Sequence, residues 1–327
     1  MTGDTDDLLE PLCRGERRAL SRAITLVEST RSDHRARAMS LLAALPDRQA
    51  LRIGMSGTPG VGKSTFIEAF GLMLTGQGLR VAVLAVDPSS ARSGGSILGD
   101  KTRMDYLSRD PRAYIRPSPS GATLGGVGRR TREAIRLCEA AGHDVVLVET
   151  VGVGQSETLV AEMTDLFVLL LAPAGGDELQ GVKRGIMEMA DLILINKADG
   201  ELLSPARRTV ADYAGALRLL RKRAQDPDGF PKALPVSATT GDGLDRAWSE
   251  MQSLAGWRRA QGHFDTNRAT QARQWFQAEL RAALLARIET PEARDRLSVL
   301  GQQVAQGALL PGVAVQDMLD WLDGARR

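Results

Sequence analysis

Residues 57–64 read Gly-Thr-Pro-Gly-Val-Gly-Lys-Ser and fit the pattern G-x-x-x-x-G-K-[ST] at every defined position. An apolar run at 51–56 precedes this octapeptide, and an amphipathic run at 63–76 follows it. In a strand–loop–helix unit of this kind, glycines let the backbone amides turn inward around an anion, and the helix N-terminus adds the positive end of its dipole. The pattern therefore predicts a phosphate-binding loop, and it restricts the chain to folds that hold such a loop at the end of a buried strand.

The residues of this loop have different expected roles. Lys63 would reach the β and γ phosphates of a nucleotide, and the Ser64 hydroxyl would bind Mg2+, which prefers hard oxygen ligands. The nucleotide-binding residues that we predict here are Gly57, Thr58, Pro59, Gly60, Val61, Gly62, Lys63, Ser64 and Thr65.

Short apolar runs alternate with longer amphipathic runs between residues 50 and 250. Several short runs are apolar at consecutive positions, as expected for a parallel sheet that helices cover on both faces. We predict an α/β fold: a three-layer P-loop NTPase core with a mostly parallel sheet, flanked by N-terminal and C-terminal helical extensions. The predicted strands are 51–56, 81–86, 113–116, 145–149, 166–171, 192–196 and 234–237, and the predicted helices are 63–76, 127–141, 156–163, 182–190, 204–224 and 243–255.

Composition and charge exclude several other classes of protein. The net charge is +2, so the chain has no general attraction for nucleic acid. The longest nearly unbroken apolar run, 166–174, has nine residues, whereas a membrane-spanning helix needs about 20. Cys13 and Cys138 are too few for a disulfide framework. The first ten residues are acidic and lack basic residues, so we expect no targeting signal and predict a cytoplasmic protein.

A second motif points to the base of the nucleotide. Residues 196–199 read Asn-Lys-Ala-Asp after an apolar run, and 237–239 read Ser-Ala-Thr after another. The N-K-x-D carboxylate can accept hydrogen bonds from guanine N1–H and its exocyclic amine, whereas adenine would leave it unpaired. The pair of motifs therefore predicts GTP rather than ATP. The residues that we assign to the base are Asn196, Lys197, Asp199, Ser237, Ala238 and Thr239.

Acidic residues near the ends of predicted strands are candidate Mg2+ ligands. Asp87 and Glu149 end two buried strands, and Asp100 follows a glycine-rich segment. Carboxylates at strand ends face the crevice in which a nucleotide binds, so we assign these three, with Ser64, to the metal.

The catalytic residues that we predict are Lys63, Asp87, Glu149 and Gln155. Glu149-x-x-Gly152 departs from the common D-x-x-G pattern, and no glutamine follows Gly152 directly. The group that positions the attacking water is therefore not located by the sequence, and we expect slow hydrolysis that a partner accelerates.

Helical patterns flank the core. On the N-terminal side, Leu20, Ile24 and Val27 fall on one helical face. On the C-terminal side, Phe276, Leu280, Leu284 and Ile288 recur every four residues, and Thr290-Pro291 begins a further helix. We predict an N-terminal helical extension (1–48), a P-loop GTPase domain (49–255) and a C-terminal helical arm (256–327). Packing onto the core and homodimerisation both remain open for the arm, although a second copy would supply the surface that it lacks.

With these motifs, the chain resembles the methylmalonyl-CoA mutase-associated GTPases, the MeaB and ArgK group also called LAO/AO transport ATPases. The resemblance rests on residues 57–65, 86–90, 149–157 and 196–199, and extends over nearly the whole chain. It implies a homodimer that escorts an adenosylcobalamin-dependent methylmalonyl-CoA mutase, with GTP binding and hydrolysis gating cofactor loading and protecting the mutase from inactivation. It also implies that 175–183 signals the nucleotide state to the mutase, where Gln180 and Lys183 are the residues to test.

Two alternative functions remain open. A nickel metallochaperone would need clustered soft or imidazole ligands, whereas His34, His143 and His263 are scattered along the chain. An ATPase or kinase attached to an amino-acid transporter would not need the guanine-reading Asp199.

Overall fold

The computed structural model describes residues 3–86, 104–117, 124–150, 156–173 and 184–324. The chain divides into two compact units, residues 1–271 and 272–327. No helix in the described ranges is both long and apolar enough to cross a membrane.

A seven-stranded sheet forms the centre of the first unit, in the order β3-β2-β4-β1-β5-β6-β7. Every neighbouring pair of strands is parallel, as predicted. The inner strands are fully buried because helices cover both faces, which explains their unbroken apolar sequences. The strands are β1 (Leu51–Gly57), β2 (Val81–Val86), β3 (Ala113–Arg116), β4 (Val145–Thr150), β5 (Leu166–Leu171), β6 (Leu192–Ile195) and β7 (Lys232–Pro235).

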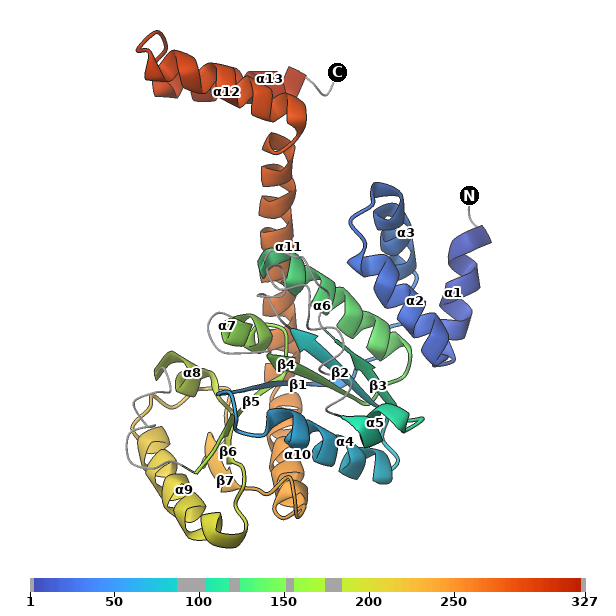
Figure 1. Ribbon diagram of the computed structural model, residues 1–327, viewed down its shortest axis with the longest axis vertical. Coiled ribbons are helices and arrows are strands. Elements are labelled where there is room, and N and C mark those ends of the chain that lie inside the picture. The colour runs from blue at the N-terminus through green and yellow to red at the C-terminus, as the bar shows by residue number, and fades with distance from the viewer. Residues whose placement is uncertain (1–2, 87–103, 118–123, 151–155, 174–183, 325–327) are drawn as a thin grey trace. The chain divides into compact units, whose positions relative to one another are not determined.

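Helices lie on both faces of this sheet (Figure 1). One face is covered by α4 (Lys63–Gly76), α5 (Asp105–Arg109) and α10 (Leu244–Ala260), and the rings of Phe70 and Trp248 meet edge to face there. The other face carries α6 (Leu124–Ala140) and α7 (Ser156–Ala161), with α8 (Arg184–Met189) beside β5 and α9 (Leu203–Arg218) beside β6 and β7. The three-layer α/β prediction is confirmed.

Three helices precede the core: α1 (Gly3–Cys13), α2 (Arg17–Glu28) and α3 (Ser32–Ala43). They pack together and against α6. Leu20, Ile24 and Val27 of α2 are buried, as their spacing predicts. Arg35 of α3 forms an ion pair with Glu133 of α6 at 2.5 Å, so these helices are part of the first unit.

In the second unit, α11 (His263–Ile288) continues from the first unit and is followed by α12 (Pro291–Ala305) and α13 (Pro311–Gly324). The predicted start of α12 is confirmed, because the Thr290 side chain accepts a hydrogen bond from the Ala293 amide. A small apolar cluster joins α12 to α13 through Leu300 and Met318. Few other side chains of this unit are buried.

Aspartates cap the amino-terminal edge of the sheet. One aspartate directly precedes each of β4, β5 and β6: Asp144, Asp165 and Asp191. Each accepts a hydrogen bond from a backbone amide, that of Arg80, Arg52 and Phe167 respectively. Arg258 of α10 binds Asp191 at 2.6 Å, and Arg268 of α11 binds Asp165 at 2.7 Å. These buried ion pairs fasten α10 and the start of α11 to the edge of the sheet opposite the phosphate loop.

His143 gives the fold a pH dependence. The imidazole is 6% exposed, its Nδ1 lies 2.9 Å from the Cys138 carbonyl oxygen, and burial lowers its pKa to about 4. The unfolded chain takes up the proton near pH 6.5, so stability is lost as the pH falls from about 6.5 towards 4. We expect the free energy of unfolding, measured by urea denaturation, to fall by about 2 kcal/mol between pH 7 and pH 5. His143→Gln should flatten this slope and His34→Gln should not; an unchanged slope in His143→Gln would contradict the assignment.

Candidate functional site

The predicted phosphate loop lies between the carboxyl end of β1 and the first turn of α4. Gly60 and Gly62 adopt φ values of 82° and 83°, which residues with a Cβ rarely adopt. A Cβ on Gly57 would lie 2.5 Å from the Leu170 carbonyl oxygen, so the strand end also requires glycine. Lys63 and Ser64 are half-buried in the first turn of α4. Gly57 and Gly62, the two glycines that the pattern defines, and Gly60 between them thus each have a backbone reason for their presence.

Side chains of the N-K-x-D segment donate hydrogen bonds to backbone carbonyls of the phosphate loop. The Asn196 amide nitrogen donates to the Val61 carbonyl at 2.9 Å, and the Lys197 ammonium donates to the Gly60 carbonyl at 2.7 Å. Asn196 is 1% exposed. The stretch of chain between the two motifs is long, yet β1, β5 and β6 are adjacent strands and bring them to one edge. The structure therefore joins the predicted phosphate and base loops through direct hydrogen bonds.

The Ser-Ala-Thr loop forms hydrogen bonds with the N-K-x-D segment. The Ala238 amide donates to the Asn196 side-chain oxygen at 3.1 Å, and the Ser237 hydroxyl donates to one carboxylate oxygen of Asp199. Ser237 also accepts a hydrogen bond from the Thr240 amide at 3.1 Å. Thr239 is exposed beside them. Asp199 is thereby oriented through one oxygen, while its carboxylate is only partly buried.

Glu149 lies at the carboxyl end of β4, between β1 and β2. It is 3% exposed and is in register with Met55 of β1, two residues before Gly57. Next to it, the hydroxyls of Ser56 and Thr150 lie 3.0 Å apart and are buried. This pair links the strand of the phosphate loop to the strand that carries Glu149. Sequence reasoning missed it, because only the order of the strands makes the two hydroxyls neighbours.

Other predicted site residues lie outside the described ranges. These are Asp87, Asp100, Gln155, Gln180 and Lys183. Among the residues that the structure does describe, no group of three or more His, Cys, Asp or Glu side chains could hold a metal ion. Ser64 and Glu149 are the described members of the predicted metal set, and they supply a hydroxyl and a carboxylate, which are oxygen donors of the type that Mg2+ prefers.

Comparison with known proteins identifies the family. Residues 20–293 match the family described as "Methylmalonyl Co-A mutase-associated GTPase MeaB". The chain belongs to the MeaB family. A "Putative GTPase" of Caulobacter vibrioides is 51% identical, with 97% of each chain covered. The mouse protein "Methylmalonic aciduria type A homolog, mitochondrial" is 51% identical, over 96% of this chain and 78% of the mouse protein.

A solved structure, described as a LAO/AO transport system kinase, superimposes with a TM-score of 0.75. It is 36% identical, and the match covers 99% of each chain. MeaB membership and this likeness confirm the predicted P-loop NTPase core and make the chain a GTPase. The inferred preference for a guanine nucleotide agrees with the family description.

Proposed function

We propose that this MeaB-family GTPase is a chaperone of an adenosylcobalamin-dependent methylmalonyl-CoA mutase, and that its nucleotide state gates cofactor loading and protects the mutase from inactivation. Family membership supports the GTPase activity and the association with a mutase. The observation that carries the mechanism is the direct bonding of Asn196 and Lys197 to the phosphate loop. Because base loop and phosphate loop form one unit, a guanine nucleotide would bind across both.

In this proposal, the described residues divide the work of binding and hydrolysis. Asp199 reads the guanine edge, and the loop backbone with Lys63 holds the phosphates. Charge that develops on the phosphate oxygens during transfer would be stabilised by these fixed donors. Ser64 and Glu149, with Asp87 and Asp100, would hold Mg2+. The ion, when bound, neutralises phosphate charge. Gln155 remains our candidate for orienting the attacking water.

We further propose that turnover is slow until the mutase is present, and that Gln180 and Lys183 transmit the nucleotide state. The cytoplasmic location stays a prediction.

The test of the escort role is co-purification of the tagged chain with candidate cobalamin-dependent mutases, in the presence of GDP or a non-hydrolysable GTP analogue. We expect one mutase to be retained to different extents with the two nucleotides. Lys183→Ala should reduce that difference, while Lys222→Ala, which removes an exposed ammonium outside the 175–183 segment, should preserve it. Equal recovery of every mutase with both nucleotides would refute the escort role.

The second unit supports a homodimer. Phe276, Leu280 and Leu284 recur every four residues on α11 and are 66%, 49% and 50% exposed. An exposed apolar stripe of this kind marks an interaction surface, and a second copy of the arm would cover it. We expect light scattering to give twice the mass of the chain, and Leu280→Glu with Leu284→Glu to give the mass of one chain while GTP binding persists. A monomeric wild-type protein at micromolar concentration would contradict this expectation.

A further inference from the structure

A pair of buried hydroxyls lies at the carboxyl edge of the sheet. Ser56 directly precedes Gly57 of the phosphate loop. Thr150 is the last residue of β4 and directly follows Glu149. The two side-chain oxygens lie 3.0 Å apart, and the residues are 1% and 0% exposed. A polar group buried this deeply needs a hydrogen-bond partner, which each hydroxyl supplies for the other.

The fold of the sheet does not require this pair. β1 and β4 are already joined by a parallel ladder, whose last backbone pair is Met55 with Glu149. An alanine and a valine would fill the two positions of Ser56 and Thr150, and replacing both partners of a buried hydrogen bond by apolar groups is close to neutral for stability. The hydroxyl bond instead extends the link between the strands beyond the ladder, to the point where both chains leave the sheet.

The pair lies on the face of the sheet opposite to the Glu149 side chain. Successive residues of a strand point to opposite faces. Val145 and Leu147 belong to the apolar cluster on the face that carries α4, so Glu149 points to that face, where Lys63 begins α4. Thr150 points to the other face. A bond that holds Thr150 restricts rotation of the strand end about its axis, and it therefore also sets the direction of the Glu149 carboxylate.

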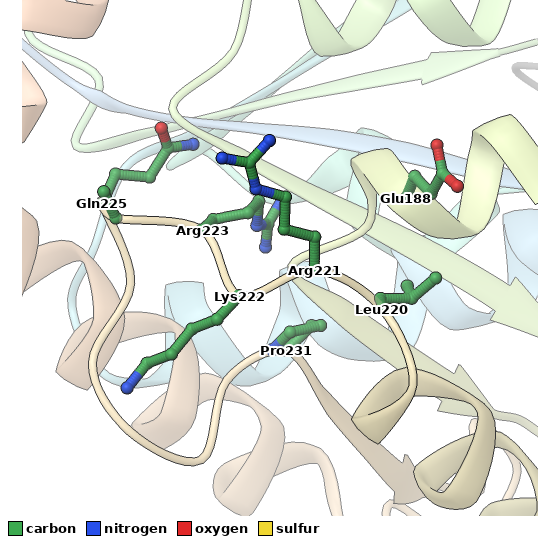
Figure 2. Close-up of a pocket in the computed structure, with 8 residues that line it drawn as sticks. Glu188, Leu220, Arg221, Lys222, Arg223, Gln225 and Pro231 are labelled. Atoms are coloured by element: carbon green, nitrogen blue, oxygen red, sulfur yellow. The ribbon is translucent and has the colours of Figure 1, made fainter.

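Charged pairs elsewhere in the first unit have a different role. A cavity of about 520 Å³ lies between α8 and the loop that follows α9 (Figure 2). Arg223, which lines it, binds Asp191 at 2.8 Å, and Asp191 directly precedes β6. The cavity therefore belongs to the amino edge of the sheet, where its arginine fastens a loop to the sheet. The hydroxyl pair, in contrast, joins two strands that are already neighbours.

We propose that Ser56 and Thr150 are positioning residues for GTP hydrolysis. Their bond fixes the end of β1, which leads into the phosphate loop, against the end of β4, which carries Glu149. Groups that are fixed before the nucleotide binds lower the barrier to phosphoryl transfer. Binding of GTP, which rests on the loop amides, Lys63 and Asp199, does not depend on this bond. The inference rests on the role in hydrolysis proposed for Glu149, and it is independent of the mutase.

Ser56→Ala with Thr150→Val tests the proposal, because this double variant removes both hydroxyls and leaves neither unpaired. We expect it to keep the melting temperature and the GTP affinity of the wild type. In a single turnover, it should hydrolyse bound GTP about tenfold more slowly, since a small misplacement of a reacting group is costly. Thr150→Ser keeps the hydroxyl and should retain most of the wild-type rate. A purely structural role would change the melting temperature and leave the rate unchanged.

The single substitutions supply a second measurement. Ser56→Ala and Thr150→Val each leave one buried hydroxyl unpaired, so each should lower the melting temperature more than the double variant does. Both break the same bond. Their effects on the rate should therefore not multiply, and the double variant should be no slower than the slower single variant. Rates that multiply would show that the two hydroxyls act separately, and would contradict the proposal.

Thr164→Val is the matched control, because it removes another buried hydroxyl of the same unit. Thr164 is 2% exposed and donates to the Val160 carbonyl at 2.8 Å. This variant should hydrolyse GTP at the wild-type rate. Glu149→Gln, in contrast, should be at least as slow as the double variant, because it alters the group that the hydroxyl pair directs.

Three results would overturn the proposal: a wild-type rate in the double variant, a GTP affinity that falls by the same factor as the rate, or an equally slow Thr164→Val. Full turnover in Glu149→Gln would refute the role of Glu149 in hydrolysis, and the positioning role with it. Loss of turnover in Glu149→Gln, together with a wild-type rate in the double variant, would refute the positioning role alone.

Discussion

Lys63→Ala is expected to lower GTP turnover by about 10²–10³-fold, because it removes a fixed positive charge from the phosphates on which charge develops during transfer. Lys63 is the first residue of α4, next to Gly62 with its left-handed φ, so its side chain starts at the mouth of the loop. The amides of the loop remain in this variant. Binding of GTP should therefore weaken by less than the loss in turnover. Phosphate release at saturating GTP, with calorimetric GTP affinity, measures both quantities.

Lys222→Ala is the matched control. It removes an exposed ammonium that is paired with Asp228 and that lies far from Lys63 in the sequence. It should turn over GTP at the wild-type rate. A Lys63→Ala variant with full turnover would show that the loop does not hold the reacting phosphates, and the proposed site would have to be abandoned. Circular dichroism on both variants separates loss of function from loss of fold.

Asp199→Ala should remove most of the discrimination between GTP and ATP. A carboxylate that accepts two hydrogen bonds from guanine is left unpaired by adenine, and sites of this kind discriminate by a factor of about 10⁴. Without the carboxylate, we expect competing GTP and ATP to bind within about tenfold of each other. GTP itself should bind far more weakly, while ATP binding changes little. Ser237 loses one partner but keeps its bond to the Thr240 amide.

The control for this substitution is Asp228→Ala, which removes an exposed carboxylate outside the site. Competition of both nucleotides against a fluorescent GDP analogue measures the ratio of affinities in all three proteins. If Asp199→Ala keeps a preference of a thousandfold or more for GTP, the guanine contacts lie elsewhere. The hydrogen bond from Ser237 would then have only a structural role.

Most of the sheet could be predicted from sequence, because buried parallel strands have unbroken apolar runs that begin and end at turn residues. The sequence pattern places the last strand two residues late, at 234–237, whereas β7 is Lys232–Pro235. Its first residue is polar, and the pattern did not anticipate that Lys232 would be half-buried beside Glu250. At the edge of a sheet, such a side chain can pair without entering the core.

Tertiary contacts also shortened α9. The sequence pattern predicts a helix that reaches residue 224, whereas α9 ends at Arg218. Arg223 binds Asp191 and Asp226. The chain therefore leaves the helical path between Arg218 and Arg223. Helix propensity favours the basic run at 221–223, yet buried ion pairs outweigh it. The N-terminal extension likewise has three helices where the pattern indicated two segments, since α1 lacks a clear apolar stripe.

Within the site, short motifs located the loops, whereas contacts between strands stayed hidden. The phosphate loop and Asn196 are recognisable because their chemistry requires particular residues at fixed spacing. Ser56, Thr150 and the aspartates before the strands have no such spacing. Asp165 in a sequence reads as an ordinary turn residue, and its bonds to Arg52 and Arg268 depend on elements far away in the chain. Three-dimensional neighbours, rather than local pattern, determine these roles.

The two edges of the sheet expose the protein to different kinds of damage. Residues at the carboxyl edge could be altered one at a time and still leave a folded but inactive chain. At the amino edge, loss of Arg258 would leave the buried carboxylates of Asp191 and Asp226 with Arg223 but without their second guanidinium partner. A chain destabilised in this way would be cleared by the cell rather than accumulate. Two variants with equally low activity in an extract could therefore differ in amount: the first would be present as folded protein, and the second would be depleted.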